Sequence, residues 1–133
     1  MRIKIIAILF AMFVIAVIVQ ADRGALPPAL ARYRVLPGAD VLGHFVLIGI
    51  LALLVNLAIG ARTVTIIGRQ CLVGSVVVGL LVFLEEFSQL YIPVRSFSLL
   101  DLTADGLGIA CAGFLVGRWA PDRKVRTEPK GNP

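Results

Sequence analysis

The sequence predicts an all-α integral membrane protein, a four-helix bundle with both chain ends on the same side of the bilayer. The first reason is composition, because 59% of the 133 residues are hydrophobic and only 16% are charged. A soluble domain of this length needs more polar residues to cover its surface. The second reason is that the apolar residues gather in four long runs. The third is the distribution of basic residues between those runs.

The four apolar runs define the expected helices, at about residues 3–20, 40–59, 70–90 and 101–119. Crossing about 30 Å of hydrocarbon takes roughly 20 residues. The third run is uncharged only from Cys71 to Leu84, so it reaches that length only if the polar residues after it belong to the helix. We expect residues 1–120 to form one transmembrane domain, followed by a basic cytoplasmic tail at 121–133.

The first run has two interpretations. It follows Arg2 and Lys4, and it ends in Val-Gln-Ala before Asp22. A basic start, an apolar stretch and small residues at the end are typical of a cleaved signal peptide, but they also suit a retained first helix. Either alternative leaves the other three helices in the same orientation.

Basic residues are distributed unevenly between the two sides of the expected bundle. Nine of the thirteen fall on one side: Arg2, Lys4, Arg62, Arg69, Arg118, Arg123, Lys124, Arg126 and Lys130. The positive-inside rule places this side, with both termini, in the cytoplasm. The basic tail is expected to attract lipid headgroups, and nothing in it indicates nucleic-acid binding.

Acidic residues show the opposite distribution. Six of the eight fall at the outer ends of the helices: Asp22, Asp40, Glu85, Glu86, Asp101 and Asp105. Acids contribute little to topology, so this one-sided cluster needs another explanation. Ionisable groups at this depth cost about 2.5–3.5 kcal/mol each on insertion scales, and they normally face a partner or a wet cavity.

Helical spacing brings several polar residues onto shared faces. The pairs three or four residues apart are Asp40 with His44, Glu85 with Gln89, Glu86 with Gln89, and Asp101 with Asp105. Glu85 and Glu86 are neighbours about 100° apart, so they point in different directions. We therefore predict a functional cluster of Asp40, His44, Glu85, Glu86, Gln89, Arg95, Asp101 and Asp105.

A short connection joins the third and fourth helices. Pro93 disfavours helix at the residue before it, and Ser96 or Ser98 could cap the next helix. This connection would hold Arg95 over the cluster, paired with Glu86 or Asp101. Small residues, with Gly113 and Gly117 in a GxxxG pattern, predict close helix packing.

Two segments resemble the VanZ-like family of small bacterial membrane proteins: ADVLGHF at 39–45 and EEFSQLYIPVRSFSLLDLTADGLGIACAG at 85–113. The matching positions are Asp40, His44, Glu86, Gln89, Pro93, Arg95, Asp101 and Gly108. Whether Glu85 or Glu86 is the family's principal acid stays open. Asp105 stands where the family usually has asparagine.

The resemblance implies a multi-pass protein of the bacterial cytoplasmic membrane. The family's founding member is linked to resistance to teicoplanin, a lipoglycopeptide antibiotic. We expect this chain to bind an envelope molecule at its outer face, such as a lipid headgroup, a cell-wall precursor or a lipoglycopeptide.

Other functions are compatible with the same residues. The cluster could be a purely structural ion-pair network. It could belong to an intramembrane acid–base enzyme, or to one that holds Mg²⁺ or Ca²⁺ in an oxygen-rich site. His44 is the single histidine, which excludes a zinc site of several histidines. The small-residue faces would also suit an accessory subunit that packs against a membrane-protein partner.

Overall fold

The structure, a computed structural model, describes residues 1–25, 27–28, 32, 38–93 and 95–119. In this part of the chain the long helices are α1 (Arg2–Asp22), α3 (Ala39–Ala58), α4 (Val73–Ser88) and α5 (Leu99–Trp119), and one 3₁₀ turn, η1 (Gln89–Tyr91), extends α4. All four long helices are long and apolar enough to cross a membrane. The predicted tail at 121–133 and much of the loop before α3 lie outside the described residues.

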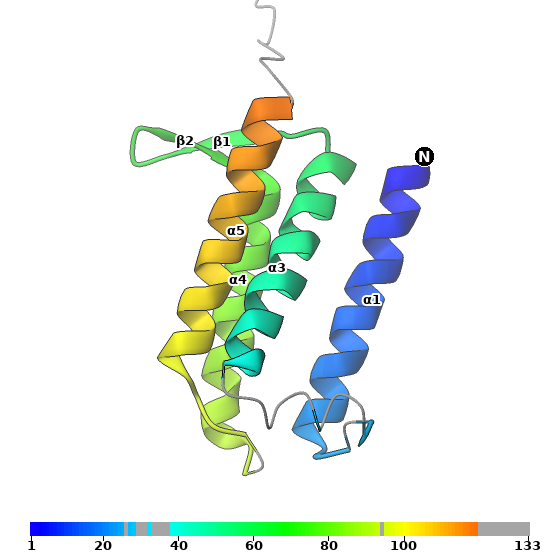
Figure 1. Cartoon of the computed structure of the whole chain (residues 1–133). Helices are drawn as coiled ribbons and strands as arrows, with labels where there is room; N and C mark the ends of the chain where they lie inside the picture. Colours follow the sequence, from blue (N-terminus) through cyan, green and yellow to red (C-terminus); the bar gives the residue numbers. More distant parts are fainter. Residues whose placement is uncertain (26, 29–31, 33–37, 94, 120–133) are drawn as a thin grey trace, which may run out of the picture.

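The four helices stand side by side, with α1 beside α3 and away from α4 and α5 (Figure 1). At one end of the bundle, here called the hairpin end, α1 begins, α5 ends and a β-hairpin lies across the top of the view. At the other end, here called the Arg95 end, α1 and α4 end while α3 and α5 begin. The start of α1 and the end of α5 therefore share one end, as the sequence predicted.

The polar residues after Leu84 belong to the third span. Glu85 and Glu86 lie in the last turn of α4, and Gln89 begins η1. Together α4 and η1 cover Val73–Tyr91, which is 19 residues and enough for a span. The prediction that the carboxylates continue the helix is confirmed.

The prediction of an all-α chain is wrong at residues 63–72. Strands β1 (Thr63–Ile66) and β2 (Arg69–Leu72) pair antiparallel, so α4 begins at Val73 and not at residue 70. Positive φ angles at Ile67 and Gly68 make the two-residue turn between them, as tight hairpins of this length require. β-branched Thr63, Val64 and Thr65 favour the extended backbone, but the apolar run that starts at Cys71 hides this signal.

Buried residues on α4 and α5 recur at four-residue spacing. On α4 the line is Gly74, Val78, Val82 and Glu86, and on α5 it is Ala104, Gly108, Ala112 and Val116. Such lines face the neighbouring helices. Large apolar side chains on the outside are exposed on all four helices, and this surface is apolar enough to face lipid tails.

The closest helix approach lies between α3 and α5, at Gly49 and Gly108. A methyl group at Gly108 would overlap the carbonyl oxygen of Phe45 and lie 3.0 Å from the backbone nitrogen of Gly49. The predicted GxxxG pair is not this contact, because a methyl group at Gly117 would meet nothing within 4 Å. Backbone contact at Gly108 brings α5 close enough to α3 for their polar side chains to meet.

Asn56 joins α3 to the start of α4. Its side chain is fully buried; its amide nitrogen donates to Ser75 Oγ at 2.9 Å, and its Oδ1 accepts the Ser75 backbone N–H at 3.2 Å. Leu72, at the N-cap position, has no side-chain acceptor to offer. Asn56, on α3, therefore caps α4, because it accepts the Ser75 N–H, which has no acceptor within α4 itself.

Gly74→Ala is expected to lower the free energy of unfolding by about 2 kcal/mol, because a methyl group there would overlap Asn56 Oδ1 and break both contacts with Ser75. Denaturant unfolding of the purified protein in detergent measures this change. Gly79→Ala is the matched control, since its nearest neighbour would be Ile109 Cδ1 at 3.8 Å. Equal unfolding midpoints for the two variants would contradict the role of Asn56.

Candidate functional site

Polar side chains from all four helices converge at the Arg95 end. His44 and Asp105 form the innermost pair: His44 Nδ1 lies 3.2 Å from both carboxylate oxygens of Asp105. The Asp105 side chain is 2% exposed and that of His44 is 20% exposed. The helices meet here because Gly108 is one turn beyond Asp105 and Phe45 follows His44.

Glu86 anchors the loop between α4 and α5. Its side chain is fully buried, and Oε1 accepts the backbone N–H of Ser98 at 2.7 Å. Ser98 in turn caps α5, since its Oγ accepts the Asp101 N–H at 3.2 Å. The prediction of Ser98 as one of two possible caps is confirmed. Glu86 thus fixes the start of the next helix.

Gln89 connects the two neighbouring glutamates. Its amide nitrogen donates to Glu86 Oε2 at 3.1 Å and to Glu85 Oε1 at 3.0 Å. Glu85 and Glu86 point in different directions, as helical geometry predicts. Glu86 turns toward the loop before α5, while Glu85 borders a cavity between the helices. The two acids therefore have separate roles.

Arg95 lies between α1 and α4. Its Nε is 3.7 Å from Asp22 Oδ1, and its Nη2 is 3.7 Å from Glu85 Oε1. The expected pairing with Glu86 or Asp101 is wrong, because Glu86 is engaged with Ser98 and Gln89. The Arg95 side chain is only 9% exposed, and its Nε is buried without a hydrogen bond to a described residue.

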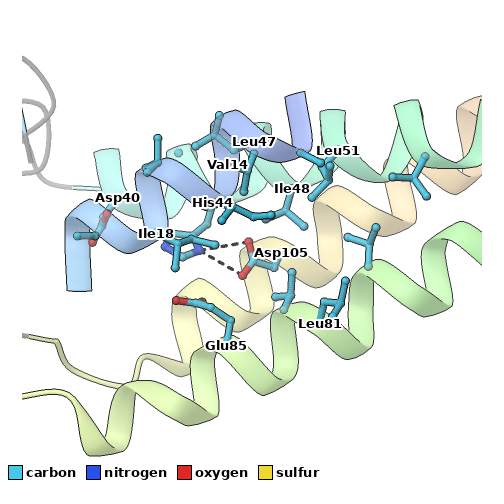
Figure 2. Close-up of a pocket in the computed structure, with 18 of the residues that line it drawn as sticks. Val14, Ile18, Asp40, His44, Leu47, Ile48, Leu51, Leu81, Glu85 and Asp105 are labelled. Atoms are coloured by element: carbon cyan, nitrogen blue, oxygen red, sulfur yellow. Dashed lines mark hydrogen bonds and ion pairs between the residues drawn. The ribbon is translucent and has the colours of Figure 1, made fainter. Parts of the chain in front are cut away.

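A cavity of about 340 Å³ runs from this cluster between α1, α3 and α4. Figure 2 shows its wall: Val14 and Ile18 of α1 face Leu47, Ile48 and Leu51 of α3, and Leu81 of α4 closes another side. Its polar lining residues are Asp40, His44, Glu85, Arg95 and Asp105. We call this space the cleft. It is apolar along its length and charged at the Arg95 end.

The predicted cluster divides into three groups. Five members line the cleft together, namely Asp40, His44, Glu85, Arg95 and Asp105. Glu86 and Gln89 are buried behind it and hold the loop and Glu85 in place. Asp101 is partly buried in the first turn of α5 and does not line the cleft.

Asp22 is the site residue that the predicted cluster lacks. It ends α1 and contacts Arg95. The sequence did contain a signal for Asp22, because it is one of the six acids that fall on one side of the expected bundle. Helical spacing alone could not pair it with Arg95, since the two residues lie on segments far apart in the sequence.

Metal binding was one of the alternatives for this cluster. In the part of the chain that the structure describes, no group of three or more His, Cys, Asp or Glu side chains is arranged to hold a metal ion. The contacts that are present are a His–Asp pair, a guanidinium near two carboxylates, and a glutamate bound to backbone.

Comparison with family models, with curated proteins and with solved structures gave no match.

Proposed function

We propose that this protein is a VanZ-like protein of the bacterial cytoplasmic membrane that binds an amphiphilic molecule of the cell envelope at the Arg95 end. The basic residues Arg2, Lys4, Arg62, Arg69 and Arg118 lie at the hairpin end, so the positive-inside rule turns the Arg95 end outward. An outward site gives access to lipids, cell-wall precursors and lipoglycopeptides.

The observation that carries this proposal is the position of the charged groups at the end of an apolar cleft. An ion-pair network that serves only to lock a bundle would satisfy its own charges. Here Arg95 lies at ion-pair distance from Asp22 and Glu85, but its Nε is buried without a hydrogen bond to a described residue, and its side chain borders a cavity. Binding sites for small molecules commonly combine an apolar wall with a few polar groups in this way.

The resemblance to a family linked to teicoplanin resistance selects the first ligands to test. Binding of a labelled lipoglycopeptide and of a labelled lipid-linked cell-wall precursor would be measured with the purified full chain. Glu85→Gln/Arg95→Gln removes one negative and one positive charge from the cleft while leaving the net charge unchanged. We expect this variant to bind at least one of the two probes about tenfold more weakly, a loss of about 1.4 kcal/mol.

Asp101→Asn is the matched control, since it makes the same acid-to-amide change outside the cleft lining. It should bind as the unaltered protein does. Equal affinity of the unaltered protein and the double variant for both probes would refute the proposed site.

A second candidate function rests on the His44–Asp105 pair. A carboxylate that holds one ring nitrogen of a histidine leaves the other nitrogen to accept or donate a proton, as in general acid–base catalysis. Mass analysis of an envelope lipid extract incubated with the protein, or with His44→Gln, tests this candidate. A product that only the unaltered protein forms would support it, and identical extracts would count against it.

A further inference from the structure

The cleft has the dimensions of one lipid tail. Its lining residues on α1 run from Ala11 to Ala21, which is about 15 Å of helix at 1.5 Å per residue. Half of a hydrocarbon core of about 30 Å is also about 15 Å. On α3 the lining runs from Ala39 to Val55, about 24 Å. The cleft is therefore at least one leaflet deep, with its apolar part at tail depth and its charged part at the level of the headgroup linkage.

The helix that forms one wall of the cleft is held by a narrow contact. Only Ala7, Val14 and Ala21 of α1 are buried, and their seven-residue spacing forms a single line along the helix. α1 packs mainly against α3. Because α1 is held mainly by α3, its contact with α4 is slight, and the cleft between α1 and α4 can take a chain from the bilayer.

The charge at the end of the cleft favours a cation. Asp22 and Glu85 both approach the guanidinium of Arg95, so these three groups together carry a net charge of −1 when both acids are ionised. A charge at this depth is costly unless it has a partner. An ammonium group beside Glu85 would supply that partner, whereas a headgroup with a net negative charge would add repulsion.

The buried guanidinium of Arg95 also favours a bound molecule that offers hydrogen-bond acceptors. Its side chain is more than nine-tenths buried. Both Arg95 Nε and Asp22 Oδ1 lack hydrogen-bond partners among the described residues. A guanidinium can donate five hydrogen bonds. Asp22 Oδ1, at 3.7 Å, is too far away to accept a hydrogen bond from Arg95 Nε. Phosphate and ester oxygens, which link a lipid headgroup to its tails, are acceptors that would supply this bond.

We infer that the cleft binds a phospholipid whose headgroup carries a primary amine. One acyl chain lies between α1 and α4, the linkage oxygens accept hydrogen bonds from Arg95, and the ammonium group lies beside Glu85. This inference rests on the proposed function and names the class of amphiphile that the site takes.

The test uses the purified full chain in detergent with equal amounts of phosphatidylethanolamine and phosphatidylglycerol that carry the same acyl chains. Native mass spectrometry measures the fraction of protein that retains each lipid. We expect the amine-bearing lipid to be retained about tenfold more than the anionic one. Equal retention of the two, or a preference for phosphatidylglycerol, would overturn the assignment of the headgroup.

Leu81→Trp fills the cleft from α4 and should reduce retention of phosphatidylethanolamine about tenfold. Leu80→Trp is the matched control, because Leu80 and Leu81 are 60% and 61% exposed but only Leu81 lines the cleft. Ile15→Trp, with Met12→Trp as its control, makes the same test from α1, where the two residues are 59% and 60% exposed and only Ile15 lines the cleft. Circular dichroism melting verifies that each variant is folded.

Unchanged lipid retention by folded Leu81→Trp and Ile15→Trp would overturn the cleft as the place of the tail. This failure is distinct from failure of the proposed function. If Glu85→Gln/Arg95→Gln loses its envelope ligand while the tryptophan variants keep the phospholipid, the proposed site stands and the cleft assignment is wrong.

Discussion

Gly108→Ala is expected to lower the free energy of unfolding by about 3 kcal/mol. The added methyl group would overlap the Phe45 carbonyl oxygen and press on the backbone of Gly49. Backbone atoms cannot rotate away as a side chain can, so α5 must move from α3. That movement also lengthens the 3.2 Å contact between His44 and Asp105.

Denaturant unfolding in detergent measures the loss, and the control lies on the same helix. A methyl group at Gly106 would meet nothing within 4 Å, and Gly106→Ala gains helix propensity as Gly108→Ala does. The control should therefore be as stable as the unaltered protein or slightly more stable. If Gly108→Ala unfolded at the same denaturant concentration as Gly106→Ala, the close approach of α3 and α5 would be disproved.

Glu86→Ala is expected to cost about 2–3 kcal/mol, because it leaves the Ser98 N–H and one Gln89 N–H without acceptors. Loss of the Ser98 contact also frees the loop that carries Arg95. Hydrogen exchange followed by mass spectrometry should show faster exchange at the Ser98 amide, together with a lower unfolding midpoint.

Glu86→Gln separates the hydrogen bond from the charge. The glutamine side chain keeps an oxygen that can accept the Ser98 N–H, so this variant should keep slow exchange at Ser98 and most of the stability. If the Ser98 amide exchanged fast in Glu86→Gln but slowly in Glu86→Ala, the proposal that Glu86 anchors this loop would be wrong.

The sequence was sufficient to predict the positions of the helices, because the length and hydropathy of the apolar runs determine where a span begins and ends. The expected spans at 3–20, 40–59 and 101–119 differ from the observed α1, α3 and α5 by at most two residues at each boundary. The hairpin was missed since it lies between two apolar runs and its second strand merges with the third run. Local patterns cannot separate a short strand from the start of a helix there.

The sequence predicted which residues belong to the site better than it predicted which of them contact one another. Helical spacing brought Gln89 to both Glu85 and Glu86, and the structure has both contacts. It could not pair Arg95 with Asp22, because that contact depends on how α1 packs. A sharper signal existed for Glu86, which continues the four-residue line of Val78 and Val82 and so had to be buried.

The bond from Ser98 to Glu86 has a consequence for the assembly of the protein in the membrane. Ser98 and Asp105, the partners of Glu86 and His44, lie at the start of α5, which is synthesised after α1, α3 and α4. Until then the earlier helices carry a carboxylate and an imidazole that lack these partners, and their insertion bears that cost. Satisfaction of these buried groups is thus coupled to the insertion of α5, and a chain that stops before Ser98 would leave both without these partners.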